Sequence, residues 1–117
     1  MSGELSTAAL IKEFVEQAIV HATAKRASKA NDAARKLAAI YREFRDLRPV
    51  DLAEFLRLVA HDHDAVRLWA ATYGLESDPG TSERVLEALS RGAPGPIRAS
   101  ATMTLREWRS GRLKVVP

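Results

Sequence analysis

DAARKLAAIY (residues 32–41) and DAVRLWAATY (64–73) are two copies of one pattern, offset by 32 residues and identical at six of ten positions. A third and weaker copy, PIRASATMT (96–104), follows a further 31 residues along the chain. Self-similarity at a fixed period of this length is the sequence signature of stacked helical hairpins. The chain is therefore predicted to be a helical-repeat protein.

Apolar side chains recur at helical spacing along most of the chain, and no segment shows a convincing run of strand alternation. Proline, glycine and short polar stretches separate these periodic segments. The pattern predicts six helices, at about 5–24, 32–47, 51–60, 65–76, 81–92 and 96–109. Since the connecting loops are short, neighbouring helices should be antiparallel.

Local signals indicate how some of these helices begin. Ser6 or Thr7 is expected to cap the first helix, and Thr81 or Ser82 the fifth, because short hydroxyl side chains accept hydrogen bonds from free first-turn amides. KRASKAND (25–32) is expected to form the polar turn between the first two helices.

The helices are expected to group into three hairpins, at about 5–47, 51–76 and 81–110. Alanines at matching positions, Ala38, Ala70 and Ala101, allow helices of adjacent hairpins to approach closely. A single hairpin cannot bury its apolar face alone, whereas about three stacked hairpins can. A chain of 117 residues is thus expected to form one all-α domain, 1–117, of three stacked hairpins.

The repeated pattern, Asp-x-Val-Arg-x-x-Ala-Ala after a short polar turn, resembles HEAT repeats of the short kind. The resemblance implies an armadillo-type fold, a right-handed α-α superhelix of about three HEAT-like hairpins. It also implies an aspartate in the turn of each hairpin and an arginine on its second helix. Asp32 and Asp64 match the aspartate, and Arg35, Arg67 and Arg98 match the arginine. The third copy has Gly-Pro in place of the aspartate, so an aspartate–arginine ladder is incomplete.

The C-terminal half carries a second resemblance. VRLWAATYGLE (66–76) and ASATMTLREWRSGRL (99–113) look like a small bacterial family of single-domain proteins with a HEAT-like fold. That resemblance implies a fold and brings no activity with it.

HDHD (61–64) holds two of the three histidines and allows two interpretations. A metal site needs three or more converging ligands, and only His21 remains as a further histidine. Residues 61 and 63 also diverge, by about 200° if helical. The favoured interpretation is a capping turn, in which Asp62 or Asp64 accepts hydrogen bonds from amides at the next helix start. No metal is predicted.

Other signs of catalysis are weak. The serines lack a nearby histidine or a glycine elbow, and GAPGP (92–96) has no lysine for a phosphate loop. Trp69 and Trp108 lie on apolar stripes and are expected in the core. The chain is therefore not expected to be an enzyme or to hold a cofactor.

The net charge is +3, with 18 basic and 15 acidic residues. The most basic region is 25–48, where eight lysines and arginines stand against three acidic residues. Such a patch suits contact with nucleic-acid phosphates, although a mixed charge run is more often a solvated helix face. Nucleic-acid binding through 25–48 is kept as the alternative function.

The favoured function is a non-catalytic protein-interaction module that binds through the second-helix surface of the repeats. Arg35, Arg67 and Arg98 are the candidate partner-binding or anion-binding residues, since they would form a column if the hairpins stack in register. A structural role is favoured for them, because Asp32 and Asp64 are placed to pair with the first two.

Cellular location follows from what the chain lacks. There is no cysteine, no basic region followed by an apolar run at the N-terminus, and no apolar run near the ~20 residues that span a bilayer. A cytoplasmic protein without a membrane association is expected, either monomeric or homodimeric.

Overall fold

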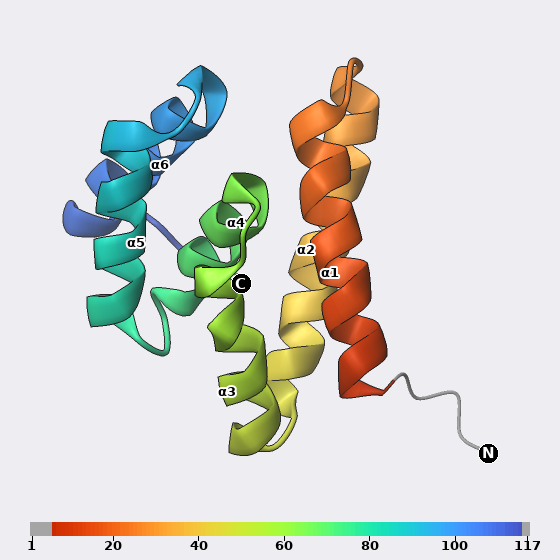
Figure 1. The fold of residues 1–117 in the computed structure, drawn as a ribbon. Helices are drawn as coiled ribbons and strands as arrows, with labels where there is room; N and C mark the ends of the chain where they lie inside the picture. Colours follow the sequence, from red (N-terminus) through yellow and green to blue (C-terminus); the bar gives the residue numbers. More distant parts are fainter. Residues whose placement is uncertain (1–5, 116–117) are drawn as a thin grey trace. The chain divides into compact units, whose positions relative to one another are not determined.

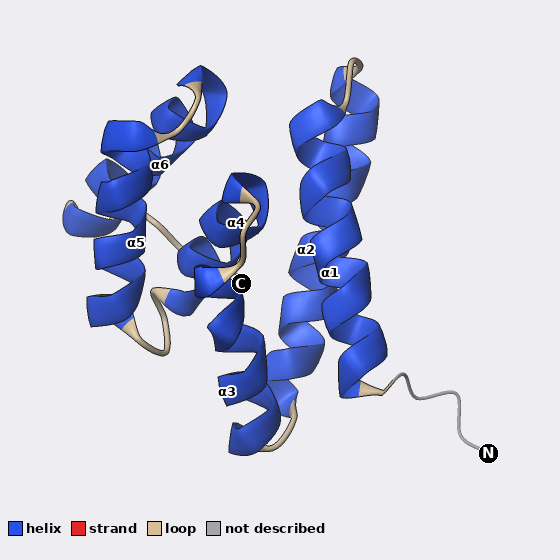
Figure 2. Ribbon diagram, in the orientation of Figure 1, coloured by secondary structure: helices blue, strands red, loops and turns tan. Residues whose placement is uncertain are grey.

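The computed structural model describes residues 6–115, which contain helices and no strand (Figures 1 and 2). The elements are α1 (Thr7–Thr23), α2 (Ala27–Asp46), α3 (Pro49–Leu56), the 3-10 helix η1 (Arg57–Ala60), α4 (Asp64–Gly74), α5 (Pro79–Gly92) and α6 (Gly95–Arg109). The prediction of an all-α fold with six helices is confirmed for this part of the chain. Residue 5, at the start of the first predicted hairpin, lies outside the described residues.

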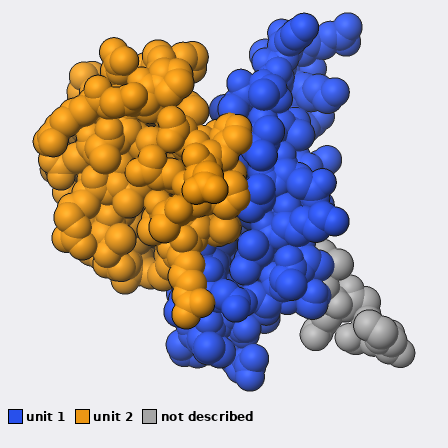
Figure 3. Space-filling model, viewed as in Figure 1, with its two compact units in different colours: residues 1–55 blue, residues 56–117 orange. Residues whose placement is uncertain are grey.

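The chain divides into two compact units, residues 1–55 and 56–117 (Figure 3). The division falls at the end of α3, inside the second predicted hairpin. The single domain and the right-handed superhelix of three hairpins stay predictions.

Unit 1 is built around an aromatic cluster. Helices α1 and α2 pack along each other as an antiparallel pair, joined by a short turn (Figure 1). Phe55, on α3, lies with its ring centroid 4.8 Å from Phe14, 5.6 Å from Tyr41 and 4.9 Å from Phe44. All four side chains are fully buried. Aromatic pairs at this range stabilise by roughly 0.5–1.5 kcal/mol beyond their buried area, so Phe55 fastens α3 to the hairpin.

The start of α1 agrees with its sequence signal. The Ser6 hydroxyl accepts a hydrogen bond from the Ala9 amide at 3.1 Å, which makes Ser6 the N-cap. Thr7, the other candidate, uses its hydroxyl differently and donates to the Asp51 carboxylate at 3.0 Å. This bond ties the first turn of α1 to the first turn of α3.

The second helix begins earlier than predicted. Helix α2 starts at Ala27, so only the first part of KRASKAND is a turn, and the prediction of a turn through residue 32 was wrong. Ala30 and the buried Ala33 continue the apolar face of the helix toward its start. Alanine has the highest helix propensity, and no glycine or proline interrupts the segment. Asp32 therefore lies within α2 and not in a turn.

Unit 2 has its own core between α4, α5 and α6. Its buried members are Leu68, Ala71, Leu75, Leu86, Leu89, Ala93, Ala101 and Leu105. Leu113 and Val115 of the tail pack against this core. Trp108 packs at the edge of the core and is half buried.

The burial of Trp69 differs from the prediction that this residue lies in the core. It is only half buried and stacks on Tyr73, with ring centroids 6.0 Å apart. Neither tryptophan is fully buried.

The indole of Trp108 donates a hydrogen bond to the Glu83 carboxylate at 3.3 Å, and Arg109 donates to the same carboxylate. Glu83 thus links α5 to the end of α6.

Two further helix starts are clear. Pro49 opens α3, two residues before the predicted start, and the helix gives way to η1 after Leu56. Helix α5 is capped by Asp78, whose carboxylate accepts from the Thr81 amide at 3.4 Å. The predicted caps Thr81 and Ser82 were wrong because Pro79 starts the helix earlier; proline is well suited to this first helical position.

Candidate anion-binding site

The predicted arginine set separates into two kinds of residue. Arg67 and Arg98 are each the fourth residue of their helix, α4 and α6. The Nε–H of Arg67 donates to the Val59 carbonyl at 3.4 Å, and that of Arg98 donates to the Ala93 carbonyl at 3.2 Å. Arg67 also pairs with the Asp64 carboxylate at 3.2 Å. Both arginines therefore bond to the chain just before their own helix.

Arg35 occupies a different setting. It lies in the middle of α2, is exposed, and pairs with Asp32 one turn earlier on the same helix. Exposed ion pairs of this kind contribute about 0–1 kcal/mol, so the pair does little for stability. Asp64 is the first residue of α4 and directly follows a turn, whereas Asp32 lies within α2.

The HDHD stretch forms a capping turn, as predicted, but the capping groups are histidines. His61 Nδ1 accepts from the His63 amide at 3.0 Å, and His63 Nδ1 accepts from the Ala65 amide at 3.2 Å. Asp64 is the first residue of α4 and its carboxylate is engaged by Arg67, while Asp62 is exposed. The prediction that an aspartate caps this helix was therefore wrong. No group of three metal-ligating side chains converges among residues 6–115.

The basic region 25–48 lies on the surface. Its eight lysines and arginines are all exposed: Lys25, Arg26, Lys29, Arg35, Lys36, Arg42, Arg45 and Arg48. Within the described residues, only Arg35 and Arg48 form ion pairs, with Asp32 and Asp51. The remaining six cations are left without a carboxylate partner in that part of the chain, so this surface carries a positive field.

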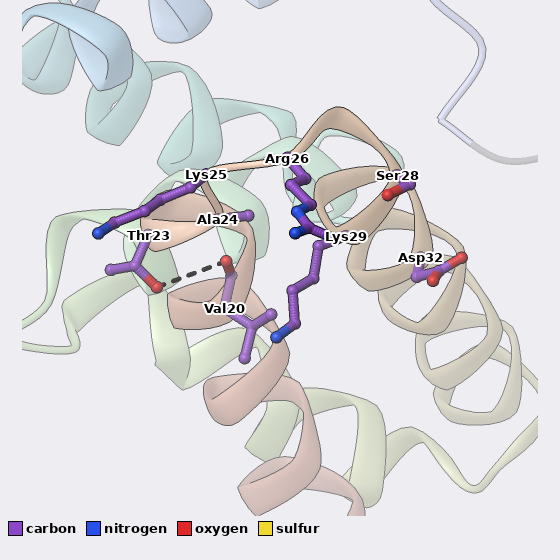
Figure 4. Close-up of a pocket in the computed structure, with 8 residues that line it drawn as sticks. All are labelled: Val20, Thr23, Ala24, Lys25, Arg26, Ser28, Lys29 and Asp32. Atoms are coloured by element: carbon purple, nitrogen blue, oxygen red, sulfur yellow. Dashed lines mark hydrogen bonds between the residues drawn. The ribbon is translucent and has the colours of Figure 1, made fainter.

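Three of these cations meet at one pocket, at the turn between α1 and α2 (Figure 4). The pocket has a volume of about 650 Å³. It is lined by Val20, Thr23, Ala24, Lys25, Arg26, Ser28, Lys29 and Asp32. In this view the Lys29 side chain begins near the end of the Arg26 side chain and continues toward Val20, whereas Lys25 points away from both on the Thr23 side (Figure 4). The Thr23 hydroxyl donates to the Ile19 carbonyl at 2.9 Å, which fixes that wall.

A second, smaller pocket in unit 1 provides a contrast. It measures about 400 Å³ and lies between Leu10 and Glu13 of α1 and the middle of α2. Its charged lining is balanced, with Glu13 and Glu43 beside Lys36 and Arg42. A balanced lining has no preference for an anion, whereas the pocket at the α1–α2 turn has three cations and one carboxylate.

Two titratable groups of unit 1 are shifted from their ordinary values. The hydrogen bond from Arg48, together with that from Thr7, lowers the pKa of Asp51, because both donors stabilise the charged carboxylate. Partial burial lowers the pKa of His21 by disfavouring the imidazolium. Neither group lines the pocket at the α1–α2 turn.

The α2–α3 turn exposes apolar side chains. Leu47 is 41% exposed and Val50 is 63% exposed, with the exposed Pro49 between them. Arg45 and Arg48 flank this group and are exposed as well. We call Leu47, Pro49 and Val50 the apolar corner. The apolar corner and the two arginines beside it together have an apolar centre and a charged rim, which is the composition of a protein contact surface.

Comparison with known proteins gives no family: no family model matches the chain, and no curated protein or solved structure matches it. Among the described residues, no helix combines the length and the apolar character needed to cross a bilayer.

The pocket at the α1–α2 turn was not predicted as a site. The sequence marked region 25–48 as basic, but Arg35, Arg67 and Arg98 were selected because they recur. Lys25, Arg26 and Lys29 come together with Val20 and Thr23 only once the turn ends at Arg26 and α2 starts. The sequence feature that could have indicated this pocket is the run of three cations within five residues, next to the start of a helix.

Proposed function

We propose that the protein is a non-catalytic protein-interaction module whose contact surface is the outer face of α2 with the apolar corner. The exposure of Leu47 and Val50 carries the proposal. A single exposed apolar residue is ordinary, but two of them three positions apart, beside an exposed proline and two arginines, form a patch. Arginine is enriched at protein interfaces, and the centre of an interface is more apolar than the rest of the protein surface.

The partner in this proposal is a protein with an acidic surface. Region 25–48 presents eight basic and three acidic residues, and six of the cations have no carboxylate partner in the described chain. Complementary charge speeds encounter and orients the two proteins, while the apolar corner supplies water-excluding contact. An acidic rim around an apolar depression is the surface that fits.

The proposal includes the HEAT-like repeat, with hairpins stacked as a right-handed superhelix. The equivalent bonds of Arg67 and Arg98 support it, since both are fourth in their helix and both donate Nε–H to a preceding carbonyl. Stacked hairpins usually bind through the surface of their second helices, and α2 is the second helix of the first hairpin. The internal position of Asp32 in α2 sets that first hairpin apart.

Site-specific photocrosslinking in the host cell tests the proposal. The variant Val50→p-benzoylphenylalanine places the probe in the apolar corner, and Met103→p-benzoylphenylalanine is the matched control, because Met103 is 61% exposed on α6. We expect one protein adduct that forms from position 50 and not from position 103. A nuclease-sensitive adduct would favour the nucleic-acid alternative, and an adduct with a second copy of the chain would indicate a homodimer.

The partner identified by crosslinking is then purified, and its Kd for the wild-type chain and for three variants is measured. Val50→Asp and Arg45→Glu should each raise the Kd at least about tenfold, which corresponds to roughly 1.4 kcal/mol, as expected for central interface residues. Met103→Asp should leave the Kd within about twofold. Equal effects of all three variants, or no binding by the purified protein, would contradict the proposal.

A further inference from the structure

The pocket at the α1–α2 turn is lined by three of the cations to which the proposed function assigns only long-range attraction. It lies at the start of α2, whereas the apolar corner follows the end of that helix. Its volume of about 650 Å³ is in the range of pockets that hold small molecules. Polar and charged side chains form most of its lining, so an apolar ligand has little to contact there.

The charge of the pocket is unbalanced. Lys25, Arg26 and Lys29 form no ion pair within residues 6–115. Asp32, the single carboxylate of the lining, is already paired with Arg35. Three cations lining one pocket give it a positive potential, which an anion bound there neutralises.

The donors in the pocket suit a phosphate group. A guanidinium such as that of Arg26 binds phosphate oxygens with two parallel hydrogen bonds, and lysine ammonium groups add point charges beside it. Arg26 is also the N-cap residue of α2, and its side chain makes no capping bond, so it is available to a ligand. The side chains of Arg26 and Lys29 extend in the same direction, toward the space beside Val20 (Figure 4).

We propose that the pocket at the α1–α2 turn binds a phosphate group through Lys25, Arg26 and Lys29. The phosphate belongs either to a small phosphorylated molecule or to the backbone of a nucleic acid, because the two share this chemistry. A small ligand would occupy the pocket alone. A nucleic acid would extend along α2 and also contact Arg35 and Arg42, which are exposed on the same helix.

Two probes separate these sources in the full-length chain. Inorganic pyrophosphate is titrated against ¹⁵N-labelled protein and followed by amide shifts at residues 23–29. A fluorescent 20-base-pair DNA duplex is titrated by anisotropy at several salt concentrations. The pocket variant is Lys25→Gln/Lys29→Gln, and its charge-matched control is Arg106→Gln/Lys114→Gln, two exposed cations of unit 2. Circular dichroism verifies that both variants fold, as expected for exposed substitutions.

A small-ligand site predicts saturable pyrophosphate shifts that weaken at least tenfold in the pocket variant and within twofold in the control, with no specific loss of DNA binding. A nucleic-acid site predicts DNA binding whose log–log salt slope falls by about 2 in the pocket variant, since each phosphate contact contributes about 0.9. Absence of pyrophosphate shifts at residues 23–29 together with no anisotropy change for the DNA duplex, or equal weakening in the two variants, would overturn the inference.

Discussion

The imidazole of His61 accepts a hydrogen bond from the backbone amide of His63, at 3.0 Å, and the imidazole of His63 in turn accepts from Ala65, at 3.2 Å. Both rings use Nδ1 as the acceptor, which requires the tautomer with hydrogen on Nε2. The two histidines thereby provide acceptors for the amides of residues 63 and 65, where α4 begins. An imidazole in this position does the work usually done by serine or aspartate.

The capping bond of His63 predicts a stability effect. His63→Ala should lower the free energy of unfolding by about 1 kcal/mol, the typical result of removing an N-cap acceptor. His63→Asn restores an acceptor and should remain close to wild type in urea unfolding. Asp62→Ala serves as the control because Asp62 is exposed. A larger loss for Asp62→Ala than for His63→Ala would show that the carboxylate caps α4.

A close contact between α4 and α5 gives the second prediction. A Cβ at Gly74 would lie 2.5 Å from the Ser82 hydroxyl and 3.3 Å from the Leu56 side chain. Gly74→Ala should therefore destabilise the protein by roughly 1–3 kcal/mol, as overpacking does. The same change in a Ser82→Ala background should cost less, because the closest atom is gone.

Gly80→Ala is the matched control for this overpacking effect. A Cβ at Gly80 meets only an Arg84 guanidinium nitrogen, at 3.8 Å, which is ordinary contact. Alanine there should be neutral or stabilising by up to about 1 kcal/mol, since it favours the helix. Thermal unfolding of Gly74→Ala, Ser82→Ala, the double variant and Gly80→Ala checks both expectations. Equal losses of stability for Gly74→Ala and Gly80→Ala would contradict the close contact between Gly74 and Ser82.

The Glu83 carboxylate predicts a third effect, at the junction of α5 and α6. It accepts from the Trp108 indole at 3.3 Å and from Arg109 at 3.3 Å. Glu83→Ala should lower the free energy of unfolding by about 1 kcal/mol, because the indole loses its acceptor and Arg109 keeps only its pair with Glu87, at 3.5 Å. Glu83→Gln keeps an oxygen for the indole and should cost less. A double-mutant cycle with Arg109→Ala should give a favourable coupling; zero coupling would show that the pair contributes nothing.

Asp51 predicts an acid dependence. Its folded pKa lies below the unfolded value, mainly because of Arg48 and then Thr7, so its contribution to stability is fully present above roughly pH 3.9 and is lost as the pH falls through the folded pKa. Asp51→Asn should destabilise the protein at pH 6, and the gap to wild type should close as acid is added. Thr7→Val, which removes one donor, should give an intermediate gap. A gap that stays constant down to pH 2 would contradict the assignment.

The sequence predicted helix number and order well because each break has a local cause. Pro49, Gly92 and the HDHD turn interrupt helical periodicity within a few residues, and such signals are readable without tertiary contacts. The start of α2 was different. Serine, asparagine and aspartate in 28–32 indicate a turn, but Ala30 and Ala33 place an apolar face there that packing then holds as helix.

The candidate site was harder to predict because it depends on where one turn ends. Counting charges found region 25–48, and counting repeats selected Arg35, Arg67 and Arg98. Arg67 and Arg98 proved to bond to nearby backbone carbonyls. No repeat marks Lys25, Arg26 and Lys29, since these residues precede the first copy of the pattern.

Phe55 follows the α1–α2 hairpin in the chain, yet its ring touches Phe14 and Phe44 from both helices. During synthesis the hairpin leaves the ribosome before this ring does. Until α3 emerges, the part of the aromatic surface of α1 and α2 that Phe55 covers in the folded unit stays exposed to water. The aromatic core of the N-terminal unit therefore cannot be completed before Phe55 has been synthesised.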